Sequence, residues 1–273
     1  MAWKQNIIED FKQLVSFDST SFHERNTADW LLARLKSMGF SVEEDQAGAY
    51  YGGDTGNIFA VLDGELEGDA VIFCAHMDVV EPGSGKKSVL EKDGTIHSAG
   101  DTVLGADDIS GILEILYGVQ LVLDSGKPHK KIEILFTIGE ELYVKGSDVF
   151  DYSKVTAKQA YVLDLSEETT FNIGTIQGGT ATNIVPDCCV LTAYETTLES
   201  KSVTDFQKAC EILGFSGGLT GTFGGSDNNS FAKNGIEGLV LSNGMYNAHS
   251  TREYTTVDDL YKGAELIGQL ILL

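Results

Sequence analysis

Residues 70–78 read AVIFCAHMD, and this stretch indicates the fold of the chain. The run Val71–Phe73 has no polar alternation, which is typical of a strand covered on both faces, as in a sheet that carries helices on both sides. The stretch ends in His76 and Asp78, whose side chains share one face because an extended chain alternates sides with a period of two. We therefore expect an interior strand that delivers these two polar side chains together.

The segments on both sides of this strand alternate between strand and helix patterns. Apolar residues recur at i, i+3, i+4 and i+7 in the predicted helices, and the predicted strands are short apolar runs. Thr256 offers a Thr-x-x-Asp start to the last helix. The strands are expected at 41–44, 57–62, 70–75, 131–138 and 160–165, with a hairpin at 88–96, and the helices near 7–14, 30–38, 108–123, 206–213 and 256–267. This alternation predicts an α/β domain with three layers: helix, mostly parallel sheet, helix.

Length and charge exclude several classes of protein. The 273 residues carry 19 Lys+Arg against 41 Asp+Glu, a net charge of −22, and 42% of the residues are hydrophobic. A chain of this size and composition can bury a large core and is not intrinsically disordered. Nucleic acids and anionic membranes both require clustered cations, so we expect neither as a partner.

The cysteines and the apolar runs bear on the cellular compartment. The chain has four cysteines, at 74, 188, 189 and 210, and this spacing contains no CxxC pair and no disulfide framework. The first residues, MAWKQNIIEDFKQ, lack the apolar core of a secretory leader. No run approaches the roughly 18 apolar residues of a membrane-spanning helix. We therefore expect a cytoplasmic protein without a thiolate metal site.

Polar side chains follow four successive predicted elements of the sheet. In chain order they are His76-Met77-Asp78, Asp107-Asp108, Glu140-Glu141 and Asp164. Taken singly, each has an ordinary explanation: an Asp pair can cap a helix, and a Glu pair is uninformative in so acidic a chain. Ligands of open α/β sheets bind at the carboxyl ends of the strands, where all four groups are expected. Their conjunction therefore favours a functional site, whereas His23, His97 and His129 are assigned to ordinary surface or structural positions.

The residue types predict the chemistry of this site. Imidazole and carboxylate ligands without cysteine suit zinc, cobalt or manganese. The Asp78 carboxylate could hold the N–H of His76 and so determine which ring nitrogen faces the metal. Neighbours in an extended segment point to opposite sides, so only one residue of the Glu140-Glu141 pair is expected to be a direct ligand. Asp107 and Asp108 are divided in the same way, one for the metals and one for the N-terminus of the following helix.

The order of these groups resembles the M20 metallopeptidase family, in particular its peptidase T-like branch. The resemblance spans nearly the whole chain. Besides the groups above, the segments that carry it are Gly105–Gly111, Gly174–Gly179, Asn183–Pro186, Gly224–Asp227 and His249–Leu260. The size is closer to lidless M28-type aminopeptidases, but the His249 segment and Asn183–Pro186 favour M20.

The resemblance implies a zinc-exopeptidase-like catalytic domain with two divalent metal ions, Zn²⁺ in the first instance and Co²⁺ or Mn²⁺ as alternatives. It assigns five metal ligands: His76 and Asp164 on one metal, Glu141 and His249 on the other, and Asp107 bridging them. Asp78 would orient His76. Glu140 would be the general base that activates a metal-bridging hydroxide.

The implied activity is the hydrolysis of short peptides from the amino end, as in an aminopeptidase or tripeptidase. A carboxypeptidase or deacylase of the same family is an alternative. A second alternative is a catalytically impaired metal-binding remnant.

This chain departs from the family in the segment between Asp164 and His249. Only 85 residues (249 − 164) separate them, and much of this length resembles the catalytic domain. We expect residues 1–170 and 198–273 to form that domain, and 171–197 to be a vestigial lid of two strands, Phe171–Ile176 and Thr182–Tyr194. No arginine lies between Arg34 and Arg252, so the lid arginine of many relatives is missing. The short lid argues against the usual lid-mediated dimer and leaves other oligomers open.

Overall fold

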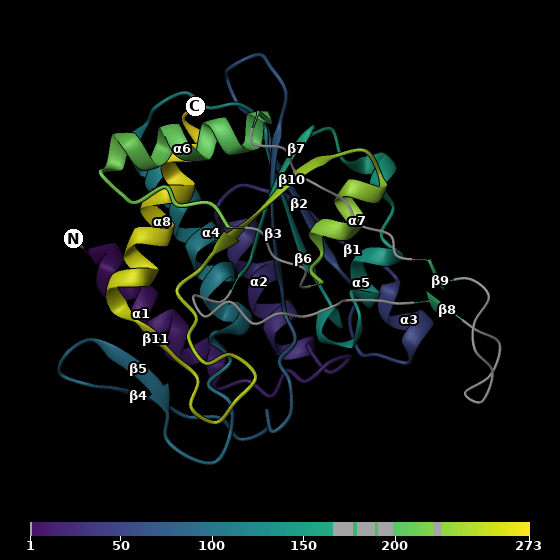
Figure 1. Ribbon diagram of the computed structural model, residues 1–273, viewed down its shortest axis with the longest axis vertical. Coiled ribbons are helices and arrows are strands. Elements are labelled where there is room, and N and C mark those ends of the chain that lie inside the picture. The colour runs from purple at the N-terminus through teal and green to yellow at the C-terminus, as the bar shows by residue number, and fades with distance from the viewer. Residues whose placement is uncertain (1, 166–176, 179–188, 191–198, 221–224) are drawn as a thin grey trace.

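The fold is built on a six-stranded sheet with helices on both faces (Figure 1). The computed structural model describes residues 2–165, 177–178, 189–190, 199–220 and 225–273. The strand order is β1 (Ser41–Glu44), β2 (Ile58–Leu62), β6 (Ile132–Thr137), β3 (Val71–His76), β7 (Gln159–Leu165) and β10 (Glu237–Ser242). The β6–β3, β3–β7 and β7–β10 pairs are parallel, and the β1–β2 and β2–β6 pairs are antiparallel. The expected α/β fold with a mostly parallel sheet is confirmed.

Strand β3 separates two hydrophobic cores, as its uninterrupted apolar sequence predicts. Phe73 and Ala75 belong to the larger core, while Ile72 and Cys74 belong to the smaller core on the opposite face of the sheet. All four side chains are buried. Successive residues of a strand point to opposite faces, so apolar residues at every position allow both faces to be covered.

The helices divide between these faces, as Figure 1 shows. The larger core receives apolar side chains from α1 (Ala2–Val15), α2 (Arg25–Ser37), α4 (Ala106–Ser125), α6 (Lys201–Leu213) and α8 (Val257–Ile271). The smaller core includes Phe231 of α7 (Asn228–Lys233). The remaining short helices are α3 (Ala47–Tyr51), α5 (Lys145–Asp148) and the 3₁₀ turns η1 (Glu140–Leu142) and η2 (Tyr152–Lys154). The Thr256 side chain accepts a hydrogen bond from the Asp259 amide, so the predicted start of the last helix is confirmed.

A second, three-stranded sheet lies beside the main domain, at the lower left of Figure 1. It contains the predicted hairpin, β4 (Ser88–Leu90) and β5 (Thr95–Ser98), which turns through Gly94 at a φ of +93°. Its third strand, β11 (Tyr254–Thr256), pairs with β5 and was not expected from the sequence. This pairing brings the end of the His249 segment close to the hairpin.

The predicted lid remnant lies mostly outside the described residues. Phe171–Ile176 falls there entirely, and of Thr182–Tyr194 only β9 (Cys189–Val190) is described. This strand pairs antiparallel with β8 (Gln177–Gly178). Within the described parts of the chain, no helix is long and apolar enough to cross a membrane.

Candidate metal centre

His76 stands at the end of β3, with both ring nitrogens occupied by neighbours. Its Nδ1 lies 2.9 Å from the backbone oxygen of Asp78, and its Nε2 lies 3.0 Å from Oδ1 of Asp107. If a metal ion displaced the Nε2 proton, the ring would still donate from Nδ1 to the Asp78 carbonyl and would offer its Nε2 lone pair to the ion. A metal-binding histidine needs this arrangement, because its second nitrogen must be held by a fixed acceptor.

The Asp107 carboxylate lies between two imidazoles. Oδ1 is 3.0 Å from Nε2 of His76, and Oδ2 is 3.1 Å from Nε2 of His249. The same His249 nitrogen lies 3.1 Å from Oε1 of Glu141. Asp107 is buried, whereas the His249 side chain is 56% exposed. Each carboxylate oxygen of Asp107 therefore faces a different histidine, so this one carboxylate is placed where it could serve two metal ions.

Glu140 and Glu141 lie in the 3₁₀ turn η1 that follows β6, so the expected extended conformation is wrong. Their backbone amides donate to the two oxygens of the Asp78 carboxylate, at 2.9 Å and 3.2 Å. Ser21 Oγ donates to the same carboxylate at 2.6 Å. Asp78 thus holds His76 mainly through its carbonyl, because its carboxylate oxygen is 3.4 Å from Nδ1 and is engaged by the Glu140 turn.

Asp164 reaches the site through an irregularity in the sheet. In the pairing of β7 with β10, Leu163 faces Leu241 but Leu165 faces Ser242, so Asp164 is an extra residue. Bulges of this kind redirect a side chain and are common beside functional sites. Ligand atoms of His76, Glu140 and Asp164 all lie within 4.8 Å of one another.

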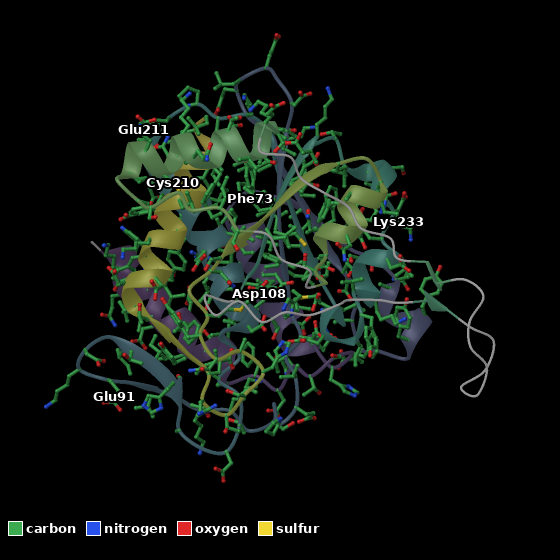
Figure 2. The ribbon with its side chains drawn as sticks, viewed as in Figure 1. Phe73, Glu91, Asp108, Cys210, Glu211 and Lys233 are labelled. Carbon is green, nitrogen blue, oxygen red and sulfur yellow. The ribbon has the colours of Figure 1, made fainter. Side chains whose placement is uncertain are left out.

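Asp108 lies behind the site, and Figure 2 labels it at the centre of the molecule. It is fully buried and accepts hydrogen bonds from the His76 amide at 3.0 Å and from Asn243 Nδ2 at 2.6 Å. It also accepts from the Gly111 amide, near the start of α4. The pair Asp107-Asp108 is therefore divided, one residue facing the histidines and the other supporting the strand and the helix.

The histidines carry positive charge when no metal is bound. Hydrogen bonds to Asp107 and Glu141 raise the pKa of His249 to about 11. Burial alone would lower the pKa of His76, but hydrogen bonds to Asp107 and Asp78 outweigh it and raise the pKa well above its ordinary value. Burial also acts against ionisation of Asp107, yet its two histidine partners hold its pKa far below the ordinary range. In the metal-free protein, the protonated imidazoles of His76 and His249 therefore supply positive charge beside the buried carboxylates.

The neighbouring carboxylates lie close together, and burial and mutual repulsion disfavour their ionised forms. Burial is the main cause that raises the pKa values of Glu140, Glu141, Asp164 and Asp227, and repulsion from nearby carboxylates adds to it. Glu141 Oε1 has His249 as its charged partner, at 3.1 Å. Burying this many carboxylates is costly unless cations lie between them.

The donor set fits divalent cations. Two overlapping groups, His76/Glu140/Asp164 and His76/Asp107/Glu141, each bring three ligand atoms within 4.8 Å. Imidazole with carboxylate and no thiolate suits Zn²⁺, Co²⁺ or Mn²⁺. All five residues expected as ligands, together with Glu140 and Asp78, meet in this one region. Glu140 lies close enough to His76 and Asp164 to share a metal ion with them. The sequence did not indicate this proximity.

Several residues that hold the site loops in place were not indicated by the sequence. Glu253 accepts hydrogen bonds from the Asp107 loop, Asn243 bonds Asp108, and Asp227 accepts from Thr137 beneath the site. Glu253 and Asp227 lie within segments that resemble the family, yet nothing local indicated their partners.

Glu24 supports the Glu140 turn from below. Its carboxylate is fully buried, and Oε1 accepts from the amides of Phe22 at 2.8 Å and Gly139 at 3.0 Å. Oε2 has no hydrogen-bond partner among the described residues. Burial, with repulsion from Asp78, raises the pKa of Glu24 to about 8. The folded, metal-free protein therefore keeps this proton to a higher pH than the unfolded chain does.

Glu24→Gln should stabilise the metal-free protein in alkali. Between the ordinary pKa near 4.5 and the folded value near 8, the folded state binds the extra proton, so wild-type stability falls as pH rises. The amide keeps an oxygen for both backbone donors and removes the buried charge. We expect a melting temperature at least ~4 °C higher than wild type at about pH 9, since one pKa unit is worth about 1.4 kcal/mol. The measurement is a thermal melt of the chelated protein at both pH values, with the exposed Glu67→Gln as control. The gain in melting temperature of Glu24→Gln should shrink at about pH 5. A gain that does not depend on pH would contradict the assignment of the raised pKa to Glu24.

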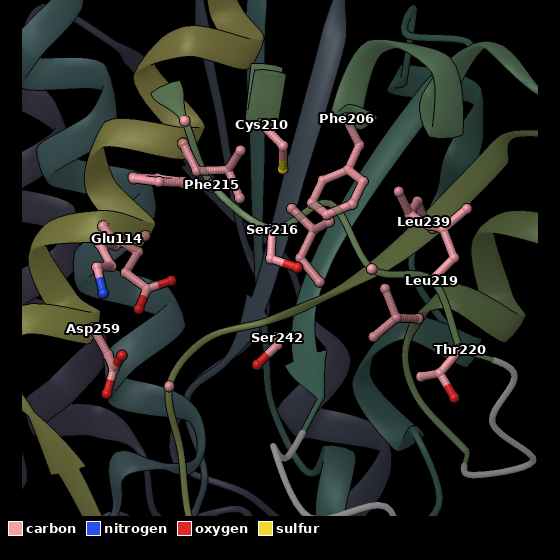
Figure 3. A pocket seen from close by; sticks show the side chains of 18 residues that line it. Glu114, Phe206, Cys210, Phe215, Ser216, Leu219, Thr220, Leu239, Ser242 and Asp259 are labelled. Carbon is pink, nitrogen blue, oxygen red and sulfur yellow. The ribbon is translucent and has the colours of Figure 1, made fainter. Parts of the chain in front are cut away.

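A pocket of about 610 Å³ lies away from these residues, between α6, α8 and β10 (Figure 3). Apolar side chains such as Phe206 and Leu239 line it together with Glu114 and Asp259. Ser242 and Gly244 of its wall flank Asn243, which bonds Asp108. The pocket wall thus includes the chain neighbours of Asn243, and none of the expected metal ligands lines the pocket.

The chain is similar to known proteins in both sequence and fold. Residues 72–273 match the sequence profile of peptidase family M20/M25/M40. The chain is 26% identical to the uncharacterized protein YqjE of Bacillus subtilis over 367 aligned positions, covering 99% of each protein. It is 30% identical to peptidase T of Clostridium acetobutylicum over 198 residues, covering 59% of this chain and 48% of that protein. The chain thus spans about half the length of this relative.

Two solved structures share the fold over nearly the whole chain. Aminopeptidase PepT from Bacillus cereus superposes with a TM-score of 0.86 at 25% identity, covering 98% of both chains. A tripeptidase from Staphylococcus aureus also gives 0.86, at 22% identity, covering 98% of this chain and 97% of that one.

Proposed function

This chain belongs to peptidase family M20/M25/M40, and on that premise we propose that it is a metal-dependent exopeptidase that hydrolyses short peptides. The observation that carries the proposal is the Asp107 carboxylate, whose two oxygens lie 3.0 Å and 3.1 Å from the histidines at 76 and 249. Glu141 and the Glu140 turn adjoin it. A bridging carboxylate between two histidines is suited to a pair of divalent cations.

Five residues would hold the metals. His76 and Asp164 would bind one ion, Glu141 and His249 the other, and Asp107 both. When bound, the two ions would lower the pKa of a water molecule and polarise the scissile carbonyl. Zn²⁺ is the proposed metal, and Co²⁺ or Mn²⁺ would suit the same donors.

Glu140 would move the proton. Its carboxylate would accept a proton from the attacking water and deliver it to the departing amine nitrogen. In the metal-free protein, burial raises the pKa of Glu140 well above its ordinary value. Bound cations would lower that pKa again, toward the neutral range in which a base transfers protons in both directions. The Asp78 carboxylate would keep the turn of Glu140 in place through its two amide hydrogen bonds. Asp78 and Glu140 thus have separate roles, one in positioning and the other in proton transfer.

The charges favour cleavage from the amino end. Recognition of a peptide carboxylate is commonly the work of arginine, and the chain has only three, at 25, 34 and 252. The related structures are named as an aminopeptidase and a tripeptidase. We therefore place an aminopeptidase or tripeptidase activity ahead of a carboxypeptidase or deacylase.

A metal-binding protein without turnover is the second candidate. The alignment with YqjE has 367 positions and this chain has 273 residues, so at least 94 positions (367 − 273) have no counterpart here. We propose that residues 1–170 and 198–273 form the catalytic domain and that 171–197 replace the lid. A lid of this size would limit closure over the substrate and lid-mediated dimerisation. The cytoplasm remains the predicted location.

Metal analysis combined with a peptide panel separates the candidates. The enzyme should bind close to two Zn²⁺ ions per chain and hydrolyse at least some unblocked di- or tripeptides. N-acetylated and C-amidated forms of the same peptides should show which end is recognised, because an aminopeptidase loses the acetylated substrate only. Two bound metals without turnover on any peptide would support the second candidate. Failure to bind metal would contradict both.

A further inference from the structure

Glu253 connects two parts of the site that lie far apart in the sequence. Its carboxylate is 1% exposed and accepts three backbone hydrogen bonds. Oε2 receives the amides of Leu104 at 2.7 Å and Gly105 at 2.8 Å, and Oε1 receives the amide of Asp107 at 2.8 Å. Burial, with repulsion from Asp107, raises the pKa of Glu253 to about 7, and the three short backbone hydrogen bonds act against that rise. Glu253 thus holds the loop that carries the Asp107 carboxylate.

The same residue belongs to the loop that carries His249. Glu253 follows His249 by four positions and directly precedes β11, which is paired with β5. Its own amide donates to the Ser250 carbonyl at 3.1 Å. His249 has a φ of +61° and Asn247 of +51°, a left-handed conformation that non-glycine residues adopt only when their surroundings hold them. Glu253 therefore anchors this loop directly against the Asp107 loop.

We propose that Glu253 is a positioning residue of the metal centre, which holds Asp107 at the point where His76 and His249 meet it. The proposal rests on the proposed two-metal function. Asp107 is the only expected ligand shared by both ions, so a displacement of its backbone disturbs both coordination spheres at once. Groups that orient metal ligands typically contribute 10- to 100-fold to metal affinity.

Glutamine tests this role with little change in shape. The Glu253→Gln side chain keeps one oxygen but turns an N–H₂ group toward at least one backbone N–H, so donors face each other. Glu253→Asp keeps the charge but is one methylene too short to reach all three amides. It serves as the second variant if the glutamine variant does not fold.

Glu133 provides a matched control elsewhere in the molecule. It is also 1% exposed, and its carboxylate accepts the amides of Thr156 and Ala157 together with the Thr156 hydroxyl. It stands near the amino end of β6, away from the end that leads to Glu140. Glu133→Gln therefore breaks the same kind of buried contact without touching a ligand loop.

The experiment measures Zn²⁺ affinity by competition with a chromogenic chelator, and the visible absorption spectrum of the Co²⁺-loaded protein. Glu253→Gln should weaken the tighter Zn²⁺ site roughly 10- to 100-fold and alter the Co²⁺ bands, with Glu253→Asp intermediate. Glu133→Gln should lower the melting temperature comparably but leave affinity and spectrum as in wild type. Unchanged affinity and spectrum in Glu253→Gln, or equal changes in Glu133→Gln, would overturn the positioning role. Wild-type protein that binds no second metal would instead refute the proposed function itself.

Discussion

Replacing Glu140 by glutamine should reduce kcat by about 10³-fold while both metal ions remain bound. A general base typically contributes 10²- to 10⁴-fold, and the amide cannot accept the proton of the attacking water. The substitution preserves the shape of the side chain, and the Glu140 amide still donates to Asp78 because that contact is made by the backbone. Steady-state kinetics on the best tripeptide, with metal content measured on the same sample, test both halves of the expectation.

The control for this variant is Glu133→Gln, another buried glutamate on the strand that leads to Glu140. It should retain wild-type kcat at a temperature well below its melting point. Glu140 also lies within ligand distance of His76 and Asp164. If Glu140→Gln loses one equivalent of metal together with its activity, Glu140 is a ligand and its assignment as the base is wrong.

Asp107→Ala should abolish binding of both metals, whereas His249→Ala should remove one selectively. Asp107 faces both histidines, so its loss leaves each site short of an anionic ligand. Among the described residues, the His249 ring pairs with Asp107 and Glu141, and its side chain is 56% exposed, so its loss should affect one site. Titration with Zn²⁺ followed by elemental analysis after gel filtration should give close to zero and close to one equivalent, respectively.

His97→Ala is the matched control for the histidine variant. This histidine lies on the hairpin, where its ring nitrogens contact Glu91 and the Ser98 carbonyl. It should retain two equivalents of metal. Retention of both metals by His249→Ala would remove His249 from the ligand set, and retention of both by Asp107→Ala would exclude a bridging role.

Much of the fold could be predicted because its signals are local. The apolar run at Val71–Phe73 predicts a strand buried on both faces, and Phe73 and Ile72 do lie in separate cores. Thr256 predicts the start of the last helix, and its side chain does accept the Asp259 amide. Periodicity and capping are expressed within a few consecutive residues, so they can be recognised without knowledge of the partner segments.

The candidate site could be anticipated as a set of residues but not as a set of contacts. His76, Asp107, Glu141, Asp164 and His249 were all indicated by chain order and resemblance. The sequence suggested an extended Glu140-Glu141 pair, yet these residues form a 3₁₀ turn held by the Asp78 carboxylate. The bulge that displaces Asp164 depends on the register between β7 and β10, which no local pattern reveals.

The residues alone therefore establish an α/β chain with histidines and carboxylates at the ends of its strands, since hydrophobic period and strand length are properties of short segments. Three-dimensional packing decides which of those groups meet. The Glu253 carboxylate and the Asp107 amide are separated by 146 positions in the chain but lie 2.8 Å apart. Such a contact forms only when the sheet order and the β11–β5 pairing bring the two loops together. A buried carboxylate needs hydrogen-bond donors around it, and these donors come from residues that are distant in the chain.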